Sequence, residues 1–540
     1  MKFSKLTMAI AVALTASASS SAIAMSLYVD TKTKQIYAEP GRGRVLMGEF
    51  EKVGDKPQVA PAADASEIAA VRQDLDMKTN EIKALQEHAE EASKAPHVEM
   101  TDNGFEMKSK DGNFTAAVNG RMQVDSQVNV NQQTTQATGA VPQNQLADGV
   151  ALRRARLGVE GTFFKDWGYK FEYDFTRGNG TVAAGVTDAY IKWGYNKDFS
   201  LKVGAFKEPF SLEEATSNRY ITFIERNMIT NTFVDNLNTY KLGIGANYAA
   251  ERWQTGVSLQ TEPVGNNGQT TAPFGTANNN PFTQTNANGG VNRSGGSGDT
   301  SWEANARVTG MPWMESKTKF WHIGASGSYM NINNNYNANG SFSNGGVAFA
   351  ANPSTNVDRS SVLSTGNLTS GNVNATGSRT ANHITRFGAE TALVYGPFST
   401  QAEYIQANVS GTGYHNATMD GYYGYASYFL TGESRAYKGS TGAWNRLKPA
   451  RNFDMKGGWG AWELAGGYDY INLNSSAING GRMSVAKFGI NWYPNSHVRV
   501  MTNYVKTLDI NTNGTAVGSR ANSFNNGDFD IIETRVQLDW

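Results

Sequence analysis

Apolar and polar residues alternate with a period of two from about residue 113 to the end of the chain. In the first such stretch the apolar positions are Phe114, Ala116, Val118, Met122, Val124, Val128 and Val130. A period of two is typical of a β-strand, because successive side chains of a strand point to opposite faces. The pattern predicts sixteen strands, near residues 113–130, 149–163, 168–177, 186–195, 199–209, 241–250, 253–262, 301–313, 319–332, 382–396, 398–410, 420–432, 460–474, 481–494, 498–510 and 529–540.

Short and long connections alternate between these predicted strands. The turns near residues 164–167 and 495–497 are tight. The long connections are rich in Asn, Gly, Ser and Thr and cover residues 131–148, 210–240, 263–300, 333–381 and 511–528. Such alternation places short turns at one rim of the structure and long loops at the other, as in outer-membrane barrels. Residues 433–458 are the exception, since the strand order places this long segment on the rim of short turns.

Two features favour a membrane barrel over a soluble β-sandwich, which alternates in the same way. Aromatic residues such as Trp167, Trp253 and Trp321 stand near strand ends, where interfacial girdles of a barrel are found. The last predicted strand ends the chain on an aromatic residue, Trp540. We therefore predict an all-β transmembrane barrel of 16 antiparallel strands over residues 105–540. Sixteen strands enclose a space too wide for side chains to fill, which predicts a water-filled channel.

The N-terminus has the pattern of a secretory signal peptide over residues 1–24. Lys2 and Lys5 precede an apolar run from Leu6 to about Leu14, and small residues end at Ala24. A membrane-anchor helix is the alternative, but this run is shorter than the roughly 20 residues that a span requires. We expect cleavage after Ala24, export, and residence in the outer membrane of a Gram-negative cell.

Between the signal peptide and the barrel, the pattern predicts two further parts. Residues 25–64 read as an N-terminal periplasmic segment and linker. Residues 65–95 then change to a helical period, with apolar residues at 3–4 spacing. These are Ile68, Val71, Leu75, Ile82, Leu85 and Ala89. The spacing predicts a short coiled-coil helix, and the alternative is an amphipathic helix on the surface of its own domain.

Composition and motifs exclude several classes of function. The 540 residues include no cysteine, and 48 Lys+Arg balance 48 Asp+Glu, so neither a thiolate metal site nor strong nucleic-acid binding is expected. The six histidines are scattered, and the chain lacks the G-x-S-x-G and H-E-x-x-H motifs. We expect no catalytic residues, no metal, no cofactor and no nucleic-acid partner, and hence a protein that is not an enzyme.

The polar face of the predicted strands supplies candidates for the wall of the channel. Positive and negative residues share this face, so selectivity depends on where charges gather at the narrowest point. The candidate pore-lining residues are Arg121, Arg154, Arg156, Glu160, Lys170, Glu172, Asp174, Lys192 and Arg307.

The connection after the fifth predicted strand is a candidate constriction. Ser211 and Glu214 form a capping-box pattern, and residues 208–227 hold more apolar side chains than a loop in water tolerates. One interpretation is a loop folded into the barrel, with Arg219, Glu225 and Arg226 at the constriction. The other is a loop that packs on a neighbouring subunit or closes the mouth.

Several stretches together resemble the phosphate-selective porin O and P family. They are "RRARLGVEGTFFKDWGYKFEYDF", "DAYIKWGYNKDFSLKVGAFKEPFSLEEATSNRYITFIERN", "GYYGYASYFLTGESRAYK" and "GAWELAGGYDYINL". Arg153, Arg154 and Arg156 match the arginine-bearing motif of the family, and Glu225 and Arg226 match the "ER" of its third loop. The resemblance implies a trimeric channel whose third loop folds into the pore. It also implies anion selectivity from an arginine-rich vestibule and a deeper lysine cluster, for which the sequence offers no aligned counterpart.

These observations predict an outer-membrane porin for passive diffusion of small hydrophilic solutes and ions. A preference for anions or phosphate stays open, because carboxylates share the face of the arginines. The expected partners are outer-membrane lipid and lipopolysaccharide, two further copies in a homotrimer, and small anions or other hydrophilic solutes. The alternative is a structural protein that tethers the envelope through its coiled coil or binds external partners through its loops.

Overall fold

The computed structural model describes most of the chain and divides it into two units, residues 1–93 and 94–540. The described residues are 25–33, 35–50, 65–94, 97–101, 104–133, 145–176, 185–194, 198–235, 240–263, 301–336, 339–344, 347–355, 357–513 and 524–540. The predicted signal peptide, residues 1–24, lies outside them. None of the helices in these ranges has the length and apolar character needed to cross a membrane.

The first unit contains a small antiparallel sheet and one long helix. Strands β1 (Met25–Asp30), β2 (Ile36–Tyr37) and β3 (Arg44–Phe50) form the sheet in the order β2-β1-β3. Helix α2 spans Ala65–Lys94. Its apolar stripe is open to solvent in the single chain, for example at Val71 and Leu75, which are 66% and 65% exposed. Pairing of this stripe with other copies stays a prediction.

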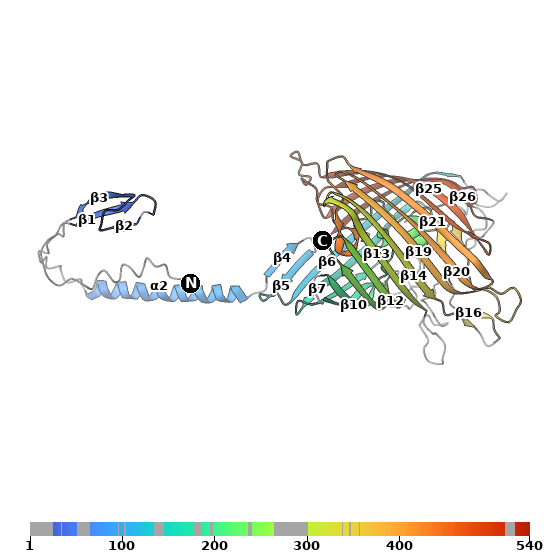
Figure 1. Ribbon diagram of the computed structural model, residues 1–540, viewed down its shortest axis with the longest axis horizontal. Helices are drawn as coiled ribbons and strands as arrows, with labels where there is room; N and C mark the ends of the chain where they lie inside the picture. Colours follow the sequence, from blue (N-terminus) through green and yellow to red (C-terminus); the bar gives the residue numbers. More distant parts are fainter. Residues whose placement is uncertain are drawn as a thin grey trace. The chain divides into compact units, whose positions relative to one another are not determined.

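The second unit contains a closed barrel of sixteen antiparallel strands, which confirms the predicted fold class. The strands slant side by side around the barrel (Figure 1). They are β6 (Thr115–Gln133), β7 (Gly149–Phe163), β8 (Trp167–Asp174), β9 (Gly185–Gly194), β10 (Phe199–Lys207), β11 (Tyr240–Ala249), β12 (Trp253–Pro263), β13 (Trp302–Ser316), β14 (Lys319–Asn331), β19 (Thr380–Tyr395), β20 (Phe398–Thr412), β21 (Tyr414–Phe429), β24 (Ala461–Ser475), β25 (Ile478–Tyr493), β26 (Val498–Asn511) and β27 (Asp528–Asp539). The barrel closes because β27 pairs with β6.

A hairpin that the sequence pattern did not predict extends the wall at the rim of short turns. Strands β4 (His97–Thr101) and β5 (Gly104–Lys108) pair with each other, and β5 pairs with the first residues of β6. Strand β27 pairs with β6 only from Arg121 onward, so β5 occupies the edge of β6 that β27 leaves open. Gly104 is required there: its φ is +101°, and a Cβ atom would lie 2.2 Å from the carbonyl oxygen of Val118.

The two faces of the wall have opposite character, as the alternation predicts. Outward residues of β7 such as Val150 and Leu157 are 73% and 45% exposed, whereas inward Arg154 and Arg156 are 4% and 6% exposed. In a soluble protein the apolar residues would be buried and the arginines exposed. Exposed apolar residues therefore mark the membrane-facing surface.

The interior is not a uniformly polar, water-filled space, which corrects one expectation. Towards the long-loop ends of β19–β27, inward residues are apolar too, including Ile384, Ile405, Met419 and Val485. They are buried because two loops fold over them. One is residues 208–235, with helices α3 (Leu212–Ala215) and α4 (Met228–Phe233). The other lies between β14 and β19 and contains β15 (Asn335–Tyr336), β16 (Phe342–Asn344), β17 (Ala350–Ala351) and β18 (Leu363–Ser364).

Candidate pore site

The loop after β10 is fixed inside the barrel at its first helix. The hydroxyl of Ser211 accepts a hydrogen bond from the Glu214 backbone N–H at 3.2 Å, so the predicted cap at the start of α3 is present. The carboxylate of Glu403, on β20, accepts hydrogen bonds from the backbone N–H groups of Leu212 (3.0 Å) and Glu213 (2.8 Å). A carboxylate at a helix N-terminus satisfies groups that the helix itself leaves unpaired.

The second helix of this loop packs against the wall through apolar contacts. Helix α4 lies against β20, β21 and β24. At Gly421 of β21 a Cβ atom would lie 2.4 Å from the Cγ2 atom of Ile229, so the absent side chain makes room for the loop. Between the two predicted alternatives, the structure decides for a loop folded into the barrel over residues 208–235.

A buried ionic network joins the start of the loop to three strands. Lys241 of β11 lies 2.7 Å from Glu208, and Arg386 of β19 lies 2.9 Å from Glu208. Both cations also pair with Glu303 of β13. Arg386 donates a further hydrogen bond to the carbonyl of Phe233 at 2.6 Å. Two positive and two negative charges compensate one another away from water, so the network fixes the loop without adding net charge.

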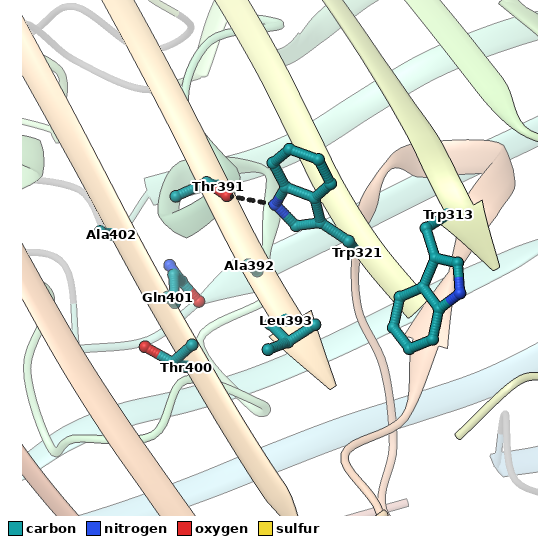
Figure 2. A pocket seen from close by; sticks show the side chains of 8 residues that line it. All are labelled: Trp313, Trp321, Thr391, Ala392, Leu393, Thr400, Gln401 and Ala402. Carbon is teal, nitrogen blue, oxygen red and sulfur yellow. Dashed lines mark hydrogen bonds between the residues drawn. The ribbon is translucent and has the colours of Figure 1, made fainter. Parts of the chain in front are cut away.

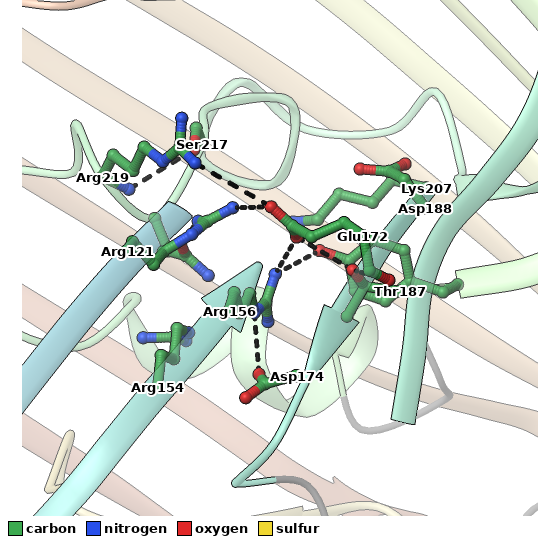
Figure 3. Close-up of polar contacts among 12 residues, drawn as sticks. Arg121, Arg154, Arg156, Glu172, Asp174, Thr187, Asp188, Lys207, Ser217 and Arg219 are labelled. Carbon is green, nitrogen blue, oxygen red and sulfur yellow. Dashed lines mark hydrogen bonds and ion pairs between the residues drawn. The ribbon is translucent and has the colours of Figure 1, made fainter. Parts of the chain in front are cut away.

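A cluster of arginines lies on the inner face of β6, β7 and the loop (Figure 3). Glu172 of β8 is at its centre: its carboxylate lies 2.5 Å from Arg121, 2.8 Å from Arg156 and 3.9 Å from Arg219. Arg156 also pairs with Asp174 at 2.7 Å. The alternation of the sequence is what brings these side chains to one face.

Arg154 differs from the other arginines of the cluster. Its Nη1 donates a hydrogen bond to the side-chain oxygen of Gln123 at 2.9 Å, and it forms no ion pair with a carboxylate within the described chain. Its Nε is buried without a hydrogen-bond partner. The cluster thus holds more arginines than carboxylates: five arginines, Arg121, Arg153, Arg154, Arg156 and Arg219, face four carboxylates, Glu172, Asp174, Glu225 and Asp539.

Arg153 reaches the loop because the strand is irregular at this point. The pairing of β6 with β7 shifts between Gln123 and Val124, so Arg153 is the extra residue of a β-bulge. Its guanidinium lies 3.2 Å from the Glu225 carboxylate of the loop. Burial by itself raises the pKa of Glu225, but Arg153 and Arg154 outweigh that effect and lower the pKa to about 2. Glu225 is therefore an ionised anchor of the loop.

The three residues predicted at the constriction have different surroundings. Arg226 is 1% exposed, and its Nε lies 2.9 Å from the Glu214 carboxylate within the same loop. Burial raises the pKa of Glu214 to about 7, although Arg226 opposes that effect. The side chain of Arg219 is 13% exposed and lies 3.7 Å from Asp539. Arg219 is thus the more open of the two arginines.

A group of lysines lies nearer the rim of short turns. Lys192 of β9 and Lys202 of β10 are directly paired across the two strands, and Lys170 of β8 pairs with Tyr190, two residues from Lys192. Paired residues have Cβ atoms about 4.5–5.5 Å apart, so like charges meet here. Lys170 is 3.5 Å from Glu160 and 3.4 Å from Asp188.

The fourth lysine of this group comes from residues 433–458, whose first half folds into the barrel. This segment contains β22 (Tyr437–Lys438), a single 3-10 turn η2 (Gly439–Thr441) and β23 (Ala443–Trp444). Lys438 lies close enough to Lys192 for the two positive charges to repel each other. Trp444 donates to the side chain of Gln401 at 2.5 Å. The segment is therefore long because it reaches across the interior from the rim of short turns.

Arg307 of β13, another predicted wall residue, holds that segment in place. Its guanidinium lies 2.6 Å from the Glu390 carboxylate and donates to the carbonyl of Gly442 at 2.7 Å. Gly442 has a φ of +56°, and a Cβ atom there would lie 2.7 Å from the Thr309 hydroxyl. Both the backbone conformation and the space require glycine.

The comparisons with known proteins agree with this geometry. A family model described as "Phosphate-selective porin O and P" matches residues 117–540. The chain belongs to this family. The porin is 26% identical to Porin O of Pseudomonas aeruginosa over 428 residues, 75% of this chain and 86% of the relative. It is also 26% identical to an uncharacterized protein of Caulobacter vibrioides, over 91% of this chain and 86% of that protein.

Two solved structures show weaker likeness. OmpT of Vibrio cholerae aligns with a TM-score of 0.44 at 10% identity, over 79% of this chain and 98% of its own. An anion-selective porin from Comamonas acidovorans aligns with a TM-score of 0.42 at 10% identity, over 79% and 100%. Since both TM-scores lie below 0.5, neither structure supports a conclusion about this chain.

Family membership confirms the predicted function and location. The porin is an outer-membrane channel for passive diffusion of small hydrophilic solutes. Family and fold indicate a channel rather than an enzyme.

The outer wall of the porin also has a hollow of about 400 Å³ (Figure 2). Trp313 and Trp321, directly paired across β13 and β14, form one side, and Leu393 and Thr400 belong to the other. The Trp321 indole N–H donates to the Thr391 hydroxyl at 2.9 Å. Amphipathic rings at this end of the strands suit the headgroup level of a membrane.

Proposed function

We propose that this porin prefers anions, and that the predicted wall residues and the lysine group provide the preference. The observation that carries the proposal is Arg154, which is 4% exposed and forms no ion pair within 4 Å in the described chain. Glu225 offsets part of its charge from a longer distance. A cation that is withdrawn from water and has no carboxylate in direct contact attracts an anion, because the local dielectric constant is low.

The lysine group supports the same preference further along the path. Four lysines, Lys170, Lys192, Lys202 and Lys438, face the two carboxylates Glu160 and Asp188. Both groups thus carry excess positive charge although the whole chain is neutral. An anion would pass from the arginines to the lysines. Chloride and inorganic phosphate both fit this charge pattern, and the family's description makes phosphate the first solute to test.

The test is the reversal potential of the purified porin in planar bilayers under a salt gradient. The wild type should conduct and should show the sign of an anion-preferring channel. At an effective dielectric constant of ~20, a charge beside the path changes the energy of a passing ion by at least about 1 kcal/mol. Arg154→Gln should therefore lower the ratio of anion to cation permeability roughly fivefold.

The matched control is Arg482→Gln. Arg482 is on the outward face of β25, where its side chain is 49% exposed and lies 3.0 Å from Asp509. Its replacement should leave the reversal potential unchanged. An unchanged potential for Arg154→Gln, or a cation-preferring wild type, contradicts the proposal. Phosphate selectivity requires in addition that phosphate reduce the chloride current at lower concentration than sulfate does.

We further propose that the porin is a homotrimer in contact with lipopolysaccharide, exported through cleavage after Ala24. The exposed apolar stripe of α2 supports assembly as a coiled coil, since apolar residues at 3–4 spacing bury themselves between helices. This helix is also the feature that favours a second role, tethering of the envelope from the periplasm.

Deletion of residues 65–94 tests the part of α2 in trimer assembly separately from the channel activity of the barrel. If the coiled coil strengthens the trimer, the deletion should lower the temperature at which the trimer dissociates on a native gel, while bilayer conductance per channel stays as in the wild type. A change in single-channel conductance would contradict the assignment of α2 to assembly or tethering alone.

A further inference from the structure

The hollow in the outer wall results from the order of side-chain sizes across neighbouring strands. Trp313 and Trp321 stand on β13 and β14 (Figure 2). Next to them, the outward positions of β19, β20 and β21 carry small residues that pair with one another across the strands. These are Thr391, Thr400, Ala402, Gly424 and Ala426. Because bulky rings stand beside small side chains, the wall is concave here.

Both threonines of the hollow use their hydroxyl groups within the wall. The Thr391 hydroxyl accepts from the Trp321 indole N–H at 2.9 Å and donates to the His322 carbonyl at 3.2 Å. The Thr400 hydroxyl donates to the Tyr425 carbonyl at 2.8 Å. A polar solute in the hollow would lose hydrogen bonds to water without replacing them, which costs free energy. The hollow therefore suits an apolar occupant.

Two lysines lie at the rim of short turns beside the hollow. Lys317 is exposed in the turn between β13 and β14. Lys319 begins β14, two residues before Trp321. Its Nζ lies 3.1 Å from the Glu315 carboxylate and 5.1 Å from the centre of the Tyr395 ring. One glutamate and two lysines leave this turn with more positive than negative charge.

The spacing of the lysines and the hollow fits the layers of a membrane. Strand residues rise about 3.3 Å each and barrel strands tilt by about 35–45°, so Lys319 and Trp321 differ in depth by about 5 Å. The polar layer on each side of a bilayer is about 5–8 Å thick. With Trp321 at the edge of the hydrocarbon core, Lys319 is at the level of the lipid phosphates. The short turns of an outer-membrane barrel face the periplasm, so this is the phospholipid leaflet.

We propose that this part of the outer wall binds one anionic phospholipid of the periplasmic leaflet. One of its acyl chains occupies the hollow, whose volume is about 400 Å³. Lys317 and Lys319 attract its phosphate group. The apolar hollow and the basic turn thus match the two chemical halves of a phospholipid. A second copy of the chain that covered the hollow with the same face would instead bring lysines together.

Native mass spectrometry of the full-length porin in micelles with added phosphatidylglycerol tests the occupant of the hollow. The wild type should retain phosphatidylglycerol at lower concentration than phosphatidylethanolamine. Ala402→Phe fills the hollow from β20 and should abolish this preferred retention. The matched control is Ala306→Phe, on the outward face of β13, where the side chain is exposed and does not line the hollow. Equal retention by the two variants overturns the proposal.

The double variant Lys317→Gln with Lys319→Gln tests the phosphate contact without changing the hollow. It should lower the affinity for phosphatidylglycerol roughly tenfold, because each lysine at a membrane surface attracts anionic lipid. The affinity for phosphatidylethanolamine should change less. The control, Lys165→Gln with Lys456→Gln, removes two exposed lysines from other connections of the same rim and should bind as the wild type does.

Two further outcomes are decisive. If the Lys317 and Lys319 variant binds phosphatidylglycerol as tightly as the wild type, the proposal is wrong, and this measurement also decides if Ala402→Phe fails to fold. If Ala402→Phe changes the oligomeric state on native gels but retains phosphatidylglycerol, a second copy covers the hollow and the proposal is overturned. Neither readout depends on the ion selectivity of the channel.

Discussion

Simultaneous replacement of Lys192, Lys202 and Lys438 by glutamate is expected to turn the porin from anion-preferring to cation-preferring. Three positive charges become three negative charges in a group whose remaining lysine, Lys170, is already paired with Glu160 and Asp188. In a confined, low-dielectric space the local field decides which ion enters. The reversal potential in a tenfold gradient, which is limited to about 59 mV for an ideally selective channel, should change sign.

The control for this charge reversal keeps the change in net charge and moves it out of the barrel. Lys165, Lys317 and Lys456 are exposed on connections of the same rim, so their replacement by glutamate alters total charge equally. The control should shift the reversal potential only slightly, and less at high salt, because charges beyond a Debye length of about 10 Å at 0.1 M are screened. If both triple variants shift it equally, the lysine group has no special part in selectivity.

The barrel itself was predictable because lipid-facing and lumen-facing side chains alternate along each strand. A residue that faces lipid must be apolar and its neighbour facing the lumen is usually polar, so each strand is visible in the one-dimensional pattern. The hairpin β4–β5 was missed because its strands hold only five residues each, too few for alternation to stand out. The apolar inward residues of β19–β27 could not be anticipated either, since their cover comes from loops without a period.

The candidate site was predictable where it depends on alternation alone. Arg121, Arg154, Arg156, Glu172 and Asp174 share a face for that reason. Regular alternation would place Arg153 on the outer face, between the inward positions of its neighbours. Only the bulge in β7 directs it to Glu225. The lysine group requires the register of β9 with β10 and the path of residues 433–458, and neither follows from spacing. An unusually long segment on the rim of short turns was the one available sign.

Replacing Arg386 with methionine is expected to destabilise the porin and free the start of its inner loop. Arg386 is fully buried and neutralises Glu208 and Glu303 together with Lys241, so its loss leaves carboxylates uncompensated away from water. Removing one member of a buried ionic group typically costs about 3–5 kcal/mol. Chemical unfolding followed by heat-modifiable mobility should report this loss. Single-channel recordings should show a larger and more variable conductance, because the loop also loses the hydrogen bond from Arg386 to Phe233.

The double variant Glu303→Gln with Arg386→Met distinguishes charge from packing. It removes one charge of each sign and leaves Glu208 paired with Lys241 at 2.7 Å. If uncompensated charge causes the instability of Arg386→Met, the double variant should recover about 0.5–3 kcal/mol, the usual coupling between directly interacting residues. If stability recovers but a steady conductance does not, the hydrogen bond from Arg386 to the Phe233 carbonyl is what fixes the position of the loop. A double variant less stable than Arg386→Met would instead mean that packing and hydrogen bonding, and not charge balance, fix the loop in the pore.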